Sequence, residues 1–194
     1  SFVYPHWNPS LKSTIFAGVW SGQMAIASDQ LLPALGTEYP QGWVRLIAHT
    51  SMAGSLWYDH KNPTTYDQSI FSAYGAGVGY LLGYGVNNLR SGSGDDGSRN
   101  AALLSTLGAL GGTTIGNQMN FTYSDWVTTG IGFGLSGWHL GCISNIATDR
   151  EWLSYNQASG LVGTGLGIAG LGLLGTGYKY EISSSDAIFL GSSA

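Results

Sequence analysis

Two side chains that could act as a base and a nucleophile stand two residues apart in segment 43–58. Polar and apolar residues alternate there, which predicts a strand with one polar face formed by Arg45, His49, Ser51 and Ser55. Residues i and i+2 of a strand share a face, with Cα atoms about 7 Å apart, so His49 could accept the proton of the Ser51 hydroxyl. We predict that this face lines a lumen or pore, where polar side chains also pair for solvation alone.

Other clusters of reactive residues carry weaker signals. His139 and Cys142 are three apart, a spacing that would serve a metal only on a helix, and no second pair accompanies them. The runs GAGVG, GIGFG and GTGLG are not followed by the Gly-Lys-Ser/Thr of a phosphate loop. Asp95 and Asp96 lie in SGSGDDGSRN, which fits no EF-hand and predicts a hydrated turn. We therefore predict no metal and no cofactor.

The segment that must organise these residues is 66–90, where glycine alternates with apolar residues. A period of two predicts a strand with one apolar face and one bare face. The bare face is expected to pack against another surface, because buried glycine strands need close neighbours. On this interpretation Gly77→Val is destabilising and Val78→Ile, on the lipid side, is nearly silent. The predicted interface glycines are Gly75, Gly77, Gly79, Gly83 and Gly85.

The composition suits a membrane better than water. Only 9% of the residues are charged, against about 25% in ordinary soluble domains. The charges cluster between long uncharged windows, namely 13–28, 68–89, 100–124, 126–148 and 152–178. A net charge of -4 argues against nucleic acid as a partner, and a single cysteine excludes an internal disulfide.

Short matches between the two halves predict a tandem duplication of about 85–90 residues. We predict one domain with four parts: an extended arm at 1–11, repeats at 12–99 and 100–186, and a tail at 187–194. The matches, in the same order in both halves, pair Ser13-Thr14-Ile15 with Ser105-Thr106-Leu107, Gln41-Gly42-Trp43-Val44 with Ser124-Asp125-Trp126-Val127, and Tyr66-Asp67-Gln68-Ser69 with Tyr155-Asn156-Gln157-Ala158.

Alternation, glycine content and aromatic residues at segment ends together resemble an outer-membrane β-barrel protein across about 13–182. The resemblance implies an all-β fold, a membrane-embedded antiparallel barrel or barrel-like sheet, located in an outer membrane or, alternatively, at the cell surface. The expected function is a porin-like pore wall, scaffold or assembly subunit without catalysis. Its expected partners are the lipid bilayer and further copies or subunits of a larger assembly. The chain ends at Ala194 rather than at the aromatic residue common in such proteins, which favours an assembly subunit.

A second resemblance concerns the pair His49 and Ser51. A His two residues before a Ser on a barrel strand resembles outer-membrane acyl hydrolases such as lipid A deacylases, which implies an alternative function as a lipid acyl hydrolase. The expected Asn is absent, because position 52 is Met52.

Two further alternatives concern the fold. Uncharged windows of 16–27 residues also match a membrane-spanning helix of about 20 residues, and glycines four apart pack helices closely. In 159–178 the glycines at 160, 163, 167 and 170 have helical spacing. A glycine-zipper, multi-spanning α-helical membrane protein is therefore the alternative fold. A soluble glycine-rich structural or filament-forming β-protein is the third possibility.

Overall fold

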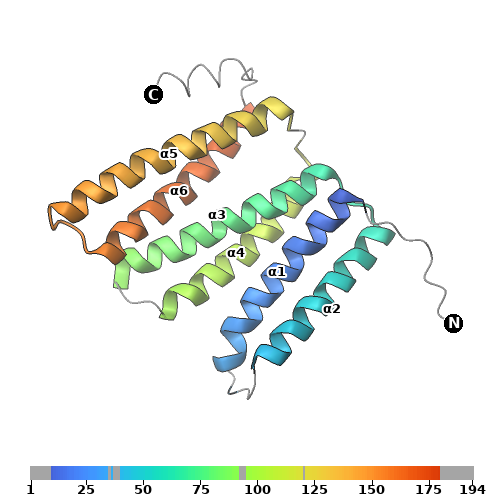
Figure 1. The fold of residues 1–194 in the computed structure, drawn as a ribbon. Coiled ribbons are helices and arrows are strands. Elements are labelled where there is room, and N and C mark those ends of the chain that lie inside the picture. Colours follow the sequence, from blue (N-terminus) through green and yellow to red (C-terminus); the bar gives the residue numbers. More distant parts are fainter. Residues whose placement is uncertain (1–9, 35, 37–39, 92–94, 120, 180–194) are drawn as a thin grey trace.

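The structure, a computed structural model, describes residues 10–34, 36, 40–91, 95–119 and 121–179. Within these residues every regular element is a helix and none is a strand (Figure 1). The prediction of an all-β barrel is therefore wrong, and with it the resemblance to an outer-membrane β-barrel. The alternative of a glycine-packed helical protein agrees with the fold. The helices are α1 (Leu11–Ala34), α2 (Pro40–Lys61), α3 (Tyr66–Ser91), α4 (Asp95–Ile115), α5 (Tyr123–Asp149) and α6 (Tyr155–Lys179).

Three of the helices begin at a capping box, in which a Ser or Thr and the residue three positions later bind each other's backbone N–H. At α3 the Thr65 N–H donates to Gln68 Oε1 at 2.8 Å, and the Gln68 N–H donates to Thr65 Oγ1 at 3.1 Å. Ser154 and Gln157 make the same pair of bonds at α6. Thr122 and Asp125 do so at α5. The backbone donors of these helix starts are satisfied locally, which fixes where each helix begins.

Gly75, Gly79 and Gly83 in α3, and Gly108 and Gly112 in α4, are four residues apart, so each of these two sets lies on one side of its helix. Gly75 and Gly108 lie against each other's backbone, and Gly112 lies against the backbone of Phe71. Small residues at such positions let two helices approach to backbone contact. The pair α3 and α4 is consequently the most closely packed in the molecule.

The six helices form an open row rather than a closed ring (Figure 1). Neighbouring contacts follow the order α2, α1, α4, α3, α6, α5, with α1 also touching α3. Consecutive helices are antiparallel and joined by short connections, so the chain forms three helical hairpins side by side. Helix α3 is central, while α2 and α5 form the two edges.

The predicted duplication stays a prediction. Two of its matched tetrapeptides, 66–69 and 155–158, are the first turns of α3 and α6. Residues 1–9 of the predicted arm and the whole predicted tail, 187–194, lie outside the described residues.

Candidate functional site

The structure does not bring the predicted catalytic pair together. Both residues are on α2, and two helical positions are about 200° apart around the axis. The exposed His49 ring places Nδ1 2.6 Å from the carbonyl oxygen of Arg45, one turn earlier. Ser51 donates across to the carbonyl oxygen of Trp20 in α1 at 3.3 Å. The geometry therefore offers no support for a hydrolase built on these two side chains.

The four residues predicted to line a lumen divide between two sides of α2. Arg45 and His49 are exposed. Ser51 and Ser55 are half-buried and border a cavity between α1, α2 and α4.

His139 and Cys142 lie on α5 and are both exposed. The His139 Nδ1 atom is 2.8 Å from the carbonyl oxygen of Leu135. In the part of the chain that the structure describes, no three His, Cys, Asp or Glu side chains come close enough to hold a metal ion.

The five predicted interface glycines point in three directions. Gly75, Gly79 and Gly83 lie against the backbone of α4, and Gly85 lies against α6 at Thr164. A Cβ atom on Gly77 would meet nothing within 4 Å. Val78, predicted to face lipid, is only 5% exposed. The structure thus reverses the predicted order of destabilisation. Gly77 has space for a new side chain, whereas the buried Val78 has little space for the additional methylene group of isoleucine.

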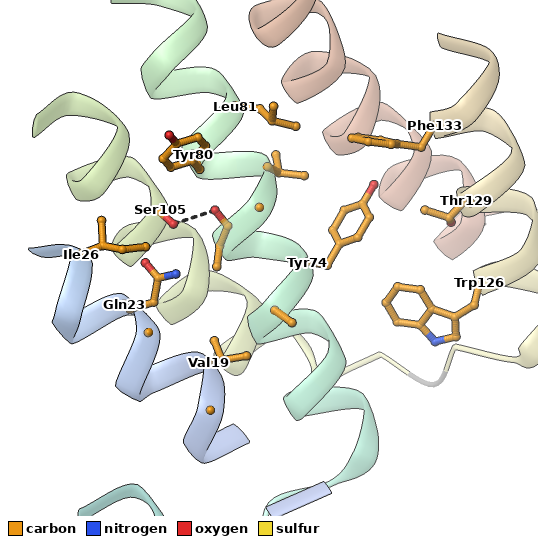
Figure 2. A pocket seen from close by; sticks show the side chains of 17 residues that line it. Val19, Gln23, Ile26, Tyr74, Tyr80, Leu81, Ser105, Trp126, Thr129 and Phe133 are labelled. Atoms are coloured by element: carbon orange, nitrogen blue, oxygen red, sulfur yellow. Dashed lines mark hydrogen bonds between the residues drawn. The ribbon is translucent and has the colours of Figure 1, made fainter. Parts of the chain in front are cut away.

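The described residues form an apolar groove of about 780 Å³ over α3, which we call the α3 groove. Helix α3 forms its floor, and α1 and α5 form its two walls (Figure 2). Figure 2 shows Gln23 on the α1 side and Thr129 on the α5 side, with the Tyr74 ring between α3 and α5. The groove exists because small residues leave space: an added Cβ would meet nothing within 4 Å at Gly18, Gly22, Gly77 or Gly130.

Aromatic rings close the groove on the α5 side. The backbones of α3 and α5 do not touch, and side chains bridge the gap between them. The Tyr74 ring centroid lies 6.1 Å from that of Trp126 and 6.5 Å from that of Phe133, both edge to face. The Tyr74 hydroxyl donates to the carbonyl oxygen of Gly170 in α6 at 3.1 Å. These contacts hold the two aromatic side chains of α5 as a fixed wall.

Two buried oxygen atoms in the wall of the α3 groove have no hydrogen-bond partner. Gln23 is 7% exposed and its Oε1 atom is unpaired; Thr129 is 2% exposed and its Oγ1 atom is unpaired. Ser105, which also borders the groove, is satisfied by donating to the carbonyl oxygen of Ala76 at 2.8 Å. The two unpaired atoms are not peculiar to the groove, because buried atoms of Trp20, Ser72 and Thr164 also lack a hydrogen-bond partner among the described residues.

A separate polar cluster joins α1, α2 and the start of α3. Asp59 is buried and accepts bonds from Ser13 Oγ at 2.5 Å, from the Thr64 N–H at 2.8 Å and from the Thr64 hydroxyl. Burial raises the pKa of Asp59, but the hydrogen bonds from Ser13 and Thr64, with the charge of Lys12, outweigh it and hold that pKa below its ordinary value. The cluster is a structural anchor between helix ends.

Comparison of the chain with protein-family models, with curated proteins and with solved structures finds no match. Function must therefore be inferred from the residues of this chain. The α3 groove was not predicted from the sequence, because three helices distant in the chain supply its lining. The sequence contained one local indication of the groove, the pair Gly18 and Gly22, which are four residues apart in an uncharged segment.

Proposed function

We propose that this protein is a membrane-embedded helical scaffold or assembly subunit. The observation that carries the proposal is an inverted distribution of side chains. Large apolar residues lie outside, and small or hydroxylated residues lie inside. In the part of the chain whose burial the structure describes, the four largest fully buried side chains are those of Phe71, Ser69, Ser72 and Ser105. A protein folded in water buries Leu and Ile instead.

The exposed apolar residues occur along the helices rather than singly. Helix α4 alone exposes Leu103, Leu104, Leu107, Leu110 and Ile115, and α1, α5 and α6 add further examples. Soluble monomers rarely expose large contiguous apolar patches, because water makes them costly. In a bilayer the same surface faces hydrocarbon, and helices associate through small residues, as α3, α4 and α6 do.

Exposed aromatic residues at both ends of the helices support the same arrangement. At the end that holds the start of α3 these are Trp57, Tyr58, Tyr66 and Tyr123; at the opposite end they are Trp43, Trp152 and Tyr155. Trp and Tyr concentrate at membrane–water boundaries. Helices of 21–27 residues are about 32–40 Å long, enough to cross the hydrocarbon core.

Among the described residues one helical segment, Tyr155–Gly175, is long and apolar enough by itself to cross a membrane. Each of the other five helices contains charged residues together with Ser, Thr, Gln or Asn, which lower its hydropathy. Many of these residues lie between helices, as Ser69 and Ser105 do, so the low hydropathy of a helix does not describe its outer surface. The proposal names a bilayer but no particular membrane, since the outer-membrane prediction depended on the barrel.

The open row of helices supports the proposal that this protein assembles with further subunits. Among the described helices, the edge helices α2 and α5 each contact the backbone of only one other, and they expose large side chains, among them Leu46 and Trp57 on α2 and Trp138 and Ile146 on α5. Edges of this kind can pair with further helices, from a second copy or another subunit.

The proposal is tested by expressing the chain and extracting the membrane fraction with alkaline carbonate and with urea. We expect the protein to stay in the pellet under both treatments, to dissolve in mild detergent and to give a helical circular dichroism spectrum there. A monomer that is stable in aqueous buffer without detergent would refute membrane embedding.

A further inference from the structure

We propose that the protein assembles with copies of itself head to tail, so that the edge helix α2 of one copy packs antiparallel against the edge helix α5 of the next. The inference deepens the proposed function, on which it rests, by naming the partner of the embedded scaffold. Three observations carry it: the positions of two histidines, the directions of the helices in the row, and the charges that the two edges expose.

The two edge helices each carry a histidine in their middle part. Among the described helices, Asp, Glu, Lys, Arg or His occurs more than six residues from both helix ends only at His49 in α2 and at His139 in α5. Both histidines are exposed. Ionisable side chains within a membrane are costly in contact with lipid and almost always face protein or a water-filled cavity. In a bilayer the outer faces of α2 and α5 are therefore expected to be covered by further protein.

Helix α4 provides the contrast, because its exposed side is apolar. Its exposed residues Leu103, Leu107 and Leu110 lie in a stretch, 100–115, that contains no Asp, Glu, Lys, Arg or His. Such a surface suits contact with lipid tails without a protein partner.

The directions of the helices favour a second copy in head-to-tail contact. Adjacent helices alternate in direction along the row, so α2 and α5 run in opposite directions (Figure 1). Copies inserted in the same orientation in one membrane are related by rotation about the membrane normal, which leaves the direction of each helix unchanged. Contact between α5 of one copy and α2 of the next continues the antiparallel row, whereas contact between two α2 or two α5 helices would be parallel. Such a heterologous contact builds rings or open chains.

The same arrangement brings the polar residues of both edges together. At a rise of 1.5 Å per residue, His49 lies about 14 Å along α2 from Pro40, and His139 lies about 15 Å along α5 from Asp149. Pro40 and Asp149 are at the same end of the row (Figure 1). Both histidines therefore lie in the same half of the proposed contact, where each edge separates the histidine of the other from lipid.

The charges exposed on the two edges are opposite. Helix α2 exposes Arg45 and Lys61, and its one acidic side chain, Asp59, is buried. Helix α5 exposes Asp149, and its other charged side chain, Asp125, is buried. Contact between like edges would bring like charges together, whereas contact between α2 and α5 brings opposite charges together. Asp149, at the C-terminal end of α5, also gains the positive N-terminal end of the neighbouring α2.

The contact is tested by cross-linking two single-cysteine forms of the full chain, co-expressed, in membranes washed with alkaline carbonate. One form carries Leu46→Cys on α2 together with Cys142→Ser; the other carries only the native Cys142 on α5 and a different affinity tag. Both positions are exposed, and they lie about 9 and 11 Å along their helices from Pro40 and Asp149. We expect a flexible bismaleimide to give a heterodimer of the two forms and no dimer when either form is expressed alone, because like edges never meet.

Leu107→Cys with Cys142→Ser is the matched control, because its parent side chain is also an exposed leucine but lies on α4 rather than at an edge. It should give no heterodimer with the form that carries Cys142. Dimers of one form alone, without the heterodimer, would show that like edges meet and would overturn the proposal. Absence of every dimer, or equal cross-linking of Leu107→Cys, would also overturn it.

A charge reversal tests the contact independently. Arg45→Glu, added to the form with Leu46→Cys, would face the carboxylate of Asp149 in the next copy, so we expect the heterodimer yield to fall about three-fold. Asp149→Arg in the other form should restore the yield, which a misfolded variant would not allow. A yield that Asp149→Arg lowers further would contradict the assigned contact.

Carbonate extraction reports separately on the proposed function. Release of the protein from the membrane by carbonate would refute membrane embedding. A protein that stays in the pellet but forms no heterodimer would refute the contact between α2 and α5 and leave membrane embedding in place.

Discussion

The packing of α3 against α4 predicts opposite effects for alanine at two glycines of the same helix. At Gly79 an added Cβ would overlap the carbonyl group of Leu104 and lie 3.0 Å from the Cα atom of Ser105. These are backbone atoms, so the two helices must separate. Overpacking of this kind costs about 1–3 kcal/mol, and the gain in helix propensity on replacing glycine, about 0.5–1 kcal/mol, only partly offsets it.

At Gly77 the same substitution meets nothing within 4 Å, so only the gain in propensity remains. We therefore expect Gly79→Ala to lower the free energy of unfolding by about 1–2 kcal/mol and Gly77→Ala to raise it by about 0.5–1 kcal/mol. The measurement is denaturation of detergent-solubilised protein by heat and by dodecyl sulfate, followed by helical circular dichroism. If Gly77→Ala is destabilised as much as Gly79→Ala, the assignment of glycines to the α4 seam is wrong.

Two further predictions concern the Asp59 cluster and the fully buried side chain of Phe71. The pKa of Asp59 is lowered in the folded protein, so its contribution to stability is present above its unfolded pKa near 3.8 and is lost as the pH falls through the lower folded value. Asp59→Asn should therefore lower stability by about 1.5–3 kcal/mol at pH 7 and flatten the acid limb of a stability–pH curve; an unchanged acid limb would contradict this. Phe71, 1% exposed and packed against Phe121 and Trp126 with ring centroids 4.8 and 5.0 Å apart, should lose about 3–5 kcal/mol on replacement by Ala in the same denaturation assay. A loss below 1 kcal/mol would show that this aromatic cluster does not hold α3 to α5.

The error in fold class has a specific physical origin in α3. Glycines at 75, 79 and 83 are four apart, an interval that fits both a strand of period two and one side of a helix. The apolar residues at even positions between them favoured the strand, yet a helix in lipid is apolar over most of its surface and leaves the same pattern. Length would have decided the question, because uncharged windows of 16–27 residues exceed the 9–11 residues of a membrane strand.

The helix starts were also present in the sequence. Thr65-Tyr66-Asp67-Gln68 and Ser154-Tyr155-Asn156-Gln157 are capping boxes, and part of each was interpreted only as evidence of duplication. The prediction that loops carry the charges is wrong for the described residues, because Arg150 and Glu151 are the only charged residues among them that lie outside the helices. Trp57, Tyr66, Tyr123 and Tyr155 do lie at or near helix ends, whereas Trp138 lies in the middle of α5.

The predictions of functional sites depended more strongly on the correct fold than the identification of helix starts does. Residues two apart share a face only in a strand, so the interpretation of His49 and Ser51 as neighbours required the predicted strand. The α3 groove depends on how α1, α3 and α5 lie together, and no spacing within one segment reports that arrangement.

The central claim, that the exposed apolar surface faces lipid, is tested most directly by cysteine accessibility in native membranes opened so that both sides meet the reagent. In a Cys142→Ser background, Leu107→Cys places the only thiol at the middle of α4, and Trp152→Cys places it in the loop between α5 and α6. Both parent side chains are exposed, 60% and 72%, so accessibility within the folded protein is matched. We predict that a charged maleimide labels Trp152→Cys and leaves Leu107→Cys unlabelled until the membrane is dissolved in dodecyl sulfate. Equal labelling of the two thiols in intact bilayers would show that α4 faces water and would contradict membrane embedding.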